Sequence, residues 1–130
     1  MFDPKTRILV VDDMMTMRKL ITKILKDIGF TDISDASDGN LAWDAVNSAE
    51  IPFGLIISDW NMPNCTGLEF LKRVRADERF IKTPFLLVTA EAEQHQVAEA
   101  VKAGVSQYLV KPFSHDSLKA KLEMVHKKVS

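Results

Sequence analysis

The chain has 130 residues, 46% of them apolar and 27% charged, which is the balance of a globular domain long enough to bury a core. A net charge of −1 excludes a strongly basic protein, so we expect neither nucleic acid nor a membrane surface as a partner. Cys65 is the only cysteine, so no internal disulfide can form. The sequence has no secretory signal and no apolar run of about 18 residues. These features predict one cytoplasmic domain over residues 1–130.

The predicted elements alternate between short apolar runs, which indicate buried parallel strands, and apolar stripes at helical spacing. In the first half of the chain, strands are predicted at residues 8–11, 33–36 and 55–58. A helical stripe over residues 17–28 follows the first strand and stops at Gly29. A second stripe, over residues 41–49, follows the second strand and ends near Pro52.

The second half of the chain continues the alternation. Thr66-Gly67 begins a third helix over residues 66–74, and Pro84 precedes a fourth strand at residues 85–88. The fourth helical stripe, residues 97–101, is stopped by Gly104. A fifth strand at 108–110 precedes a last helix that Ser114 can cap. The pattern of five strand–helix units predicts an α/β fold with a parallel five-stranded sheet and right-handed crossovers.

Charged and hydroxyl side chains follow several of these strands at the point where each strand ends. Asp12-Asp13 follow the first strand, Asp59 the third, Thr89 the fourth and Lys111 the fifth. Because ligands of open α/β sheets lie beyond the carboxyl ends of the strands, we expect these groups to share one site. Carboxylates this close repel one another unless a cation joins them.

The chemistry of this predicted site favours a hard cation and a phosphoryl group. Carboxylates without thiolates or a histidine pair suit Mg²⁺, which also prefers waters and a phosphate oxygen as ligands. Lys111 and Thr89 are suited to phosphoryl oxygens, the first as a point charge and the second as a hydrogen-bond donor. An aspartate in such a site can act as the nucleophile in phosphoryl transfer.

Each of these residues also has an ordinary structural interpretation. Asp12-Asp13 could cap the following helix, and Asp59 could belong to a turn. Thr89 could simply end a strand, and Lys111 could be a solvated lysine. The coincidence of all of them at strand ends favours the functional interpretation.

The same residues match a known family over essentially the whole chain. The set resembles the response-regulator receiver domain and consists of Asp12-Asp13, Asp59, Thr89-Ala90 and Lys111-Pro112-Phe113. Within that family the chain is similar to the single-domain chemotaxis regulators, through residues 9–13, 16–18, 58–64 and 88–92. The resemblance implies a flavodoxin-like fold with strand order 2-1-3-4-5 and a signalling protein that is not an enzyme and lacks an output domain.

The resemblance also implies the chemistry of the site. Asp59 would accept a phosphoryl group from a chemotaxis histidine kinase. The cofactor would be Mg²⁺, bound directly by Asp13, Asp59 and the backbone carbonyl of Asn61, with Asp12 acting mainly through metal-bound water. Lys111 would hold one phosphoryl oxygen, and its bond to Pro112 would be cis.

Further residues are implied to transmit and to end the signal. Thr89, the second catalytic residue, would swing toward a phosphoryl oxygen, and Tyr108 would turn inward behind it. Asn61 and Glu91 match positions that the family uses to tune dephosphorylation. The phosphorylated monomer would bind the flagellar motor switch, and a phosphatase is a further expected partner. The predicted partner face, made by the fourth helix, fifth strand and fifth helix, carries Ala92, His95, Tyr108 and Lys121.

Some positions depart from the family pattern. Asn64-Cys65-Thr66-Gly67 replaces a common Met-Asp-Gly ending, and Met14-Met15 lie beside the site. Gln94 and His95 replace charged residues that are often found on the partner face of chemotaxis regulators.

Alternative functions share parts of this site. A single-domain receiver could instead act as a phosphorelay intermediate or a phosphate sink. A Mg²⁺-dependent phosphohydrolase that uses an aspartyl-phosphate is a different class, but its two aspartates commonly lie two positions apart after the first strand, whereas Asp12 and Asp13 are adjacent. A flavin binder is disfavoured because three acidic groups would repel its phosphate.

Overall fold

The structure is a computed structural model that describes the backbone of residues 1–90 and 94–129 and the side chains of residues 1–90 and 96–128. Within these residues, one parallel sheet contains β1 (Arg7–Val11), β2 (Asp32–Ala36), β3 (Leu55–Asp59), β4 (Phe85–Thr89) and β5 (Gln107–Val110). The helices are α1 (Met15–Ile28), α2 (Gly39–Ser48), α3 (Gly67–Ala76), the short 3₁₀ helix η1 (Glu78–Phe80), α4 (Gln94–Lys102) and α5 (His115–Val129).

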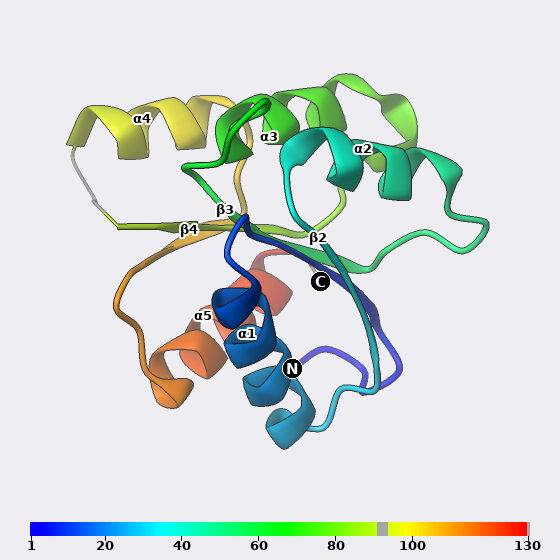
Figure 1. The fold of residues 1–130 in the computed structure, drawn as a ribbon, viewed down its shortest axis with the longest axis vertical. Coiled ribbons are helices and arrows are strands. Elements are labelled where there is room, and N and C mark those ends of the chain that lie inside the picture. The colour runs from blue at the N-terminus through cyan, green and yellow to red at the C-terminus, as the bar shows by residue number, and fades with distance from the viewer. Residues whose placement is uncertain (91–93, 130) are drawn as a thin grey trace.

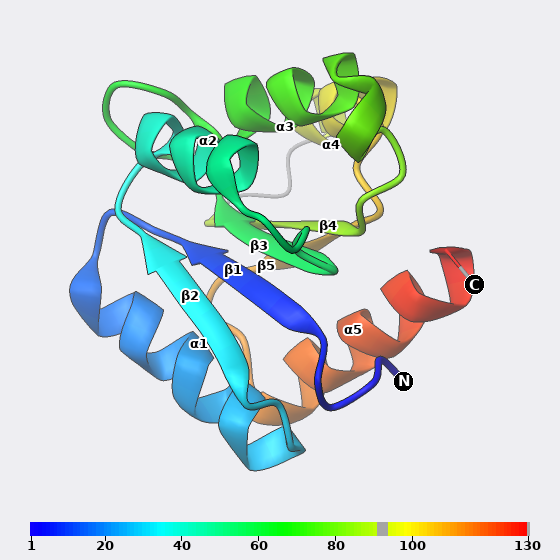
Figure 2. The ribbon, with the colours of Figure 1, turned by 90° about the vertical axis from the view of Figure 1, so that its right-hand side faces the viewer.

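The strand order is β2-β1-β3-β4-β5, which confirms the predicted flavodoxin-like arrangement. Helices α2, α3 and α4 cover one face of the sheet, and α1 and α5 cover the other (Figure 1). Figure 2 shows the same layers from the side, with the arrowhead of β2 and the C-terminal end of α5 on opposite sides of the molecule. No helix in the described part of the chain is long and apolar enough to cross a membrane.

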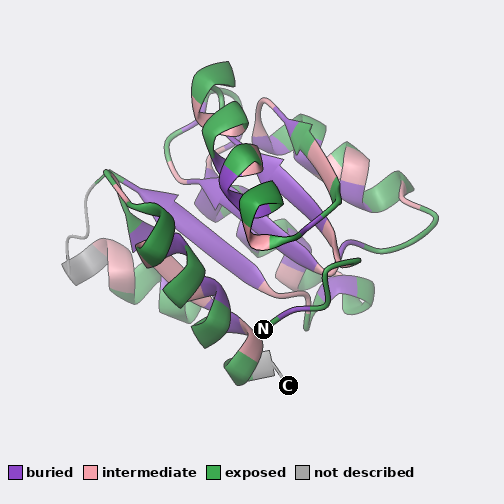
Figure 3. Cartoon of the chain, turned by 90° about the horizontal axis from the view of Figure 1, so that it is seen from below, coloured by how far each residue is buried: buried purple, intermediate pink, exposed green. Residues whose placement is uncertain are grey.

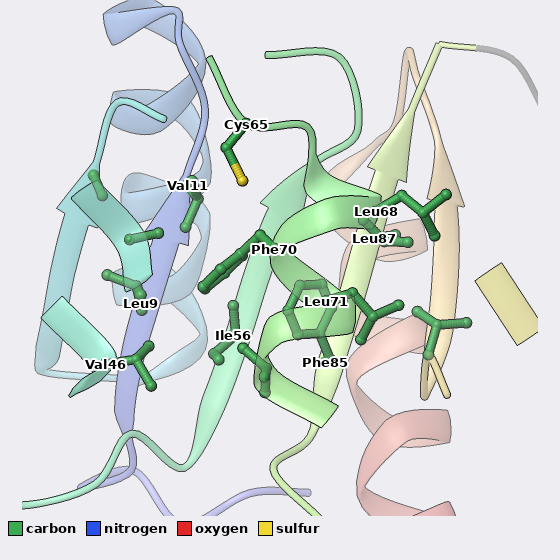
Figure 4. Close-up of a cluster of buried hydrophobic side chains, with 14 of the residues drawn as sticks. Leu9, Val11, Val46, Ile56, Cys65, Leu68, Phe70, Leu71, Phe85 and Leu87 are labelled. Atoms are coloured by element: carbon green, nitrogen blue, oxygen red, sulfur yellow. The ribbon is translucent and has the colours of Figure 1, made fainter. Parts of the chain in front are cut away.

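Each face of the sheet buries its own apolar cluster, because strand side chains alternate between the two faces. Strands β3 and β4 are buried along their whole length (Figure 3). On the α2–α3–α4 side the cluster includes Leu9, Ile56, Phe70, Leu71 and Phe85 (Figure 4). The cluster on the α1–α5 side includes Ile8, Leu25, Ile57, Leu86 and Leu122. These two cores hold the sheet rigid beneath the strand ends.

Local signals account for most of the helix ends. The side chains of Thr66 and Glu69 each accept a hydrogen bond from the backbone N–H of the other residue, which forms a capping box at the start of α3. Ser114 accepts from the Ser117 N–H at 3.0 Å, as expected for the cap of α5. Gly29, with φ of 127°, ends α1 in a conformation that favours glycine. The predicted stops and caps are thus confirmed at these positions.

The predicted apolar stripes are too wide at three positions. Leu20, Leu41 and Val101 were assigned to buried helix faces, but all three are exposed. One step along a helix turns a side chain by about 100°, so Leu20 lies off the face on which its neighbour Ile21 is buried. The short helix η1, which Asp77 caps through the Arg79 N–H, had no counterpart in the prediction.

Candidate functional site

Three carboxylates converge at the carboxyl ends of β1 and β3. Parallel pairing sets Val11 opposite Ser58, so the residues that follow, Asp12 and Asp59, meet across the two strands. One carboxylate oxygen from each of Asp12, Asp13 and Asp59 lies within 4.8 Å of the others. Asp12 and Asp59 are buried, whereas Asp13 is exposed. The cluster is therefore open to solvent on the Asp13 side.

Asp12 is held in place by backbone groups of the β1–α1 loop. Its Oδ1 atom accepts a hydrogen bond of 2.9 Å from the Met14 N–H. Its own N–H donates to the Ala36 carbonyl of β2 at 3.2 Å. The buried carboxylate consequently has a fixed orientation before any ligand arrives.

Lys111 brings a single ammonium group between the two buried carboxylates. Its Nζ atom lies 3.1 Å from Asp59 Oδ1 and 3.3 Å from Asp12 Oδ2. The backbone directs it there, because the Lys111 N–H donates to the Thr89 carbonyl at 2.7 Å, just beyond the paired residues of β4 and β5. The bond from Lys111 to Pro112 is cis, as the resemblance implied.

The charges of the cluster perturb one another. Burial raises the pKa of Asp59 above its ordinary value, and the charge of Asp12 adds to the rise. The hydrogen bond and charge of Lys111 and the N–H of Trp60 act in the opposite direction without cancelling it. For Lys111, burial lowers the pKa, but the hydrogen bond and charge of Asp59, together with Asp12, outweigh it and raise the pKa overall. Lys111 is therefore charged at neutral pH.

Within the described residues, the hydrogen bonds and ion pairs of the Asp59 carboxylate go to one of its two oxygens. Oδ1 accepts from the Trp60 N–H at 3.0 Å and from Lys111 at 3.1 Å. No hydrogen bond or ion pair from the described residues reaches Oδ2. One oxygen of the carboxylate is thus fixed, and the other is left for an incoming atom.

The other predicted site residues occupy different positions. Thr89 is buried at the end of β4, one residue beyond the register partner of Asp59. Asn61 is exposed in the loop that follows β3. Tyr108 of β5 is half-buried, and its ring centroid lies 5.1 Å from the Nζ atom of Lys121 in α5.

Three predicted residues cannot be compared with the structure. Glu91 and Ala92 lie outside the described residues, as does the side chain of His95. Of the other two histidines, His115 is exposed. His126 is half-buried, with its ring 5.0 Å from that of Phe2, because the N-terminal segment packs against α5.

Two residues that support the site were not predicted. The guanidinium of Arg18 donates to the Asp12 carbonyl at 2.7 Å and to Asp35 Oδ2 at 2.9 Å, so it ties the acidic loop to α1 and β2. Gly67 begins α3 against the end of β3, where an added Cβ atom would lie 2.1 Å from the Asp59 carbonyl oxygen. The sequence feature that could have predicted this close approach is the glycine directly after a capping threonine, because glycine has no Cβ atom.

The donor set fits Mg²⁺. Mg²⁺ takes oxygen ligands, and this cluster offers three carboxylates, two of them buried and crowded enough to repel one another. No thiolate or imidazole from the described residues joins the cluster. The geometry thus favours a hard divalent cation over zinc or another soft metal.

A doubly wound α/β sheet with three clustered carboxylates and a paired lysine beyond its strand ends is consistent with a phosphoacceptor domain. The family model of the response regulator receiver domain matches residues 8–123. The chain therefore belongs to this family. Receiver domains are signalling proteins, and no enzyme family is indicated. The predicted family is therefore confirmed.

Similar proteins include several named for chemotaxis. The chain is 46% identical over 124 residues to chemotaxis protein CheY of Pseudomonas aeruginosa, covering 95% of this chain and 98% of that protein. It is 44% identical over 119 residues to CheY1 of Helicobacter pylori, covering 92% and 95%. The solved structure of chemotaxis protein CheY4 of Vibrio cholerae superposes with a TM-score of 0.86 at 36% identity, covering 93% of this chain and 98% of that one.

Proposed function

We propose that the protein is a phosphorylation switch in which Asp59 accepts a phosphoryl group from a histidine kinase. The observation that carries the proposal is the convergence of Asp12, Asp13, Asp59 and Lys111, with Asp59 anchored through Oδ1 alone. In the transfer, Asp59 Oδ2 attacks the phosphorus of phosphohistidine. The new O–P bond forms as the N–P bond breaks, and the electron pair of that bond returns to the imidazole nitrogen.

The residues around Asp59 have distinct proposed roles. Asp13, Asp59 and the Asn61 carbonyl would hold Mg²⁺, and Asp12 would act mainly through metal-bound water. Mg²⁺, when bound, supplies charge neutralisation for the phosphoryl oxygens. Lys111 binds one phosphoryl oxygen, which its present pairing with two carboxylates supports. Thr89, buried at the adjacent strand end, binds another through its hydroxyl.

The assignment of Asp59 is tested with acetyl phosphate and Mg²⁺, followed by intact-protein mass spectrometry. We expect one added phosphoryl group on the wild type and none on Asp59→Asn. Asp44→Asn, which removes an exposed carboxylate on α2, is the matched control and should be labelled like the wild type. Equal labelling of Asp59→Asn would exclude Asp59 as the acceptor.

The cation site is tested separately by fluorescence. Trp60 follows Asp59 and donates its N–H to that carboxylate, so Mg²⁺ binding should change its emission. Trp43 lies against Phe80, with ring centroids 6.1 Å apart, and should not respond. The Mg²⁺-dependent change should persist in Trp43→Phe and disappear in Trp60→Phe. The reverse result would locate the cation elsewhere.

We propose further that the signal leaves through the face of α4, β5 and α5, and that the phosphorylated protein binds the flagellar motor switch in chemotaxis. The chemotaxis proteins of P. aeruginosa and H. pylori support this choice, at 46% and 44% identity. Phosphorylation adds nearly two negative charges beside Lys111 and Thr89. A shift of Thr89 gives Tyr108 room to turn inward, which changes the surface that includes Lys121, Ala92 and His95.

The output face is tested by the affinity for a flagellar motor-switch peptide with and without beryllofluoride, a phosphoryl mimic. The wild type should bind the peptide more tightly with beryllofluoride, by a coupling of about 1–3 kcal/mol. Tyr108→Ala should retain labelling of Asp59 but lose much of this coupling. Lys121→Glu should weaken binding without affecting the labelling. Unchanged coupling in both variants would favour a phosphate relay or sink instead.

Dephosphorylation is the remaining step of the proposed switch. Asn61 is exposed two residues after Asp59, where its side chain can reach water that approaches the phosphoryl group. We assign Asn61 and Glu91 to tuning the lifetime of the phosphorylated state, alone or with a phosphatase. Substitution of either residue should change the rate of phosphate loss more than the rate of labelling, as measured by mass spectrometry over time.

A further inference from the structure

A basic hollow of about 630 Å³ lies at the end of the sheet opposite the carboxylate cluster. It is formed by the C-terminal ends of α3 and α4, the turn before β4, the segment before β5 and the end of α5. The site described above follows the strands, whereas this hollow precedes β4 and β5. We call it the basal groove, and define it by Arg75, Ile81, Lys82, Val101, Lys102 and Lys128.

The basal groove combines positive charge with exposed apolar surface. Its lining contains four basic residues and, within the described part of the chain, no acidic residue. Ile81 is 55% exposed and Val101 is 64% exposed, although both side chains are large and apolar. The groove therefore offers a partner both positive charge and apolar surface.

Part of this charge has a structural role. Arg75 donates to the carbonyls of Gly104 and Phe80 at 2.9 and 3.1 Å, and Lys128 donates to the Ser106 carbonyl at 3.4 Å. Arg75, Lys102 and Lys128 also lie in the last turns of their helices, where cations complement the helix dipole. These roles account for much of the positive charge.

The structural roles do not account for the rest of the groove. Lys82 belongs to no helix, and within the described residues the ammonium groups of Lys82 and Lys102 make no hydrogen bond or ion pair. Helix dipoles also give no reason for Ile81 and Val101 to face water. Two unpaired ammonium groups beside two exposed apolar side chains therefore remain to be explained.

We infer that the basal groove docks an acidic, amphipathic segment of a partner protein. Carboxylates of the segment pair with Lys82 and Lys102, and an apolar side chain covers Ile81 and Val101. The volume lies within the range of about 300–1,000 Å³ for binding pockets. The groove lies at the opposite end of the strands from Asp59 and contains neither Tyr108 nor Lys121, although α4 and α5 contribute to both surfaces. We therefore expect docking that does not require phosphorylation.

The probe is a fluorescein-labelled peptide of twelve alternating glutamate and leucine residues, with binding followed by fluorescence anisotropy. Lys82→Glu/Lys102→Glu should weaken binding about tenfold or more. The matched control, Lys72→Glu/Lys119→Glu, makes the same charge change at exposed positions outside the groove and should bind like the wild type. Val101→Ser tests the apolar contribution without a charge change and should also weaken binding.

Three outcomes would overturn the inference. The peptide could fail to bind the wild type, or the groove and control variants could lose affinity equally. Binding that changes with beryllofluoride would assign the peptide to the phosphorylation-dependent face instead. Circular dichroism of each variant confirms that a loss of binding is not a loss of folding. Because the groove experiment uses unphosphorylated protein, its result is separate from that of the acetyl phosphate experiment.

Discussion

Replacement of Asp59 by asparagine should stabilise the protein in metal-free solution. Asp59 is only 6% exposed and shares its surroundings with the buried carboxylate of Asp12. An asparagine Oδ1 can still accept the Trp60 N–H, so the substitution removes the charge and keeps that hydrogen bond. The change therefore isolates the free-energy cost of the buried negative charge.

The magnitude follows from three contributions. At an effective dielectric constant of about 20, attraction to Lys111 across 3.1 Å is about 5 kcal/mol, and repulsion from Asp12 within 4.8 Å is at least about 3.5 kcal/mol. Solvent-screened Asp13 adds about 1 kcal/mol of repulsion, which leaves a net attraction near 1 kcal/mol. Desolvation of a carboxylate costs several kcal/mol and exceeds that attraction. We expect Asp59→Asn to gain about 2 kcal/mol, or about 7 °C in Tm for 130 residues.

The assay is urea denaturation in a chelating buffer, followed by circular dichroism. Asp44→Asn is the exposed control, and its free energy of unfolding should change by no more than about 0.5 kcal/mol. The pH dependence gives a second readout. Because the folded pKa of Asp59 is raised above the ordinary 3.8, the folded state holds the proton more tightly than the unfolded state. The advantage of Asp59→Asn should be absent below pH 3.8, grow as the pH rises from 3.8 to the folded pKa, and be complete above the folded pKa.

Mg²⁺ should reduce the stability difference, because it binds the folded wild type more tightly than the variant and stabilises it by mass action. The gap between the two proteins should therefore shrink as Mg²⁺ is added. An Asp59→Asn protein that is no more stable than the wild type without metal would refute the reasoning, since the attraction of Lys111 would then outweigh burial.

Three further substitutions probe the core, a helix cap and the lysine, each measured by urea denaturation. Phe70→Ala leaves a cavity under α3 and should cost about 3–5 kcal/mol, and a loss below 1 kcal/mol would mean that the core collapses around it. Asp38→Ala removes the cap of α2 and should cost about 1 kcal/mol at neutral pH. The hydrogen bond from the Leu41 N–H lowers the pKa of Asp38 below 3.8. The cost of the substitution should therefore be full above pH 3.8 and disappear as the pH falls through the folded pKa. A stability difference that does not change with pH would contradict this role of Asp38. Lys111→Met leaves two buried carboxylates without their cation and should cost about 3–5 kcal/mol. Mg²⁺ should recover part of the loss, whereas no recovery would argue against a shared cation site.

The sequence by itself was enough to predict the order of the strands and helices and the residues that group at the acidic site. Short apolar runs and helical stripes are local patterns, and the rule that parallel strands end at one edge converts them into a shared site. Asp12, Asp13, Asp59, Thr89 and Lys111 could therefore be grouped without coordinates. The caps at Thr66 and Ser114 were equally predictable, since each depends on a few adjacent residues.

Only the tertiary structure decided how the grouped charges share the site. Lys111 and Asp12 are 99 positions apart, so their 3.3 Å pairing, and the confinement of the Asp59 contacts to Oδ1, depend on how three strands align. The bridge from Arg18 to Asp35, which are 17 positions apart, is likewise a long-range contact. The exposure of Val101 in the basal groove was also invisible to the helical pattern. Periodicity gives the direction of a side chain around its own helix, whereas burial and pairing depend on which distant elements pack against it.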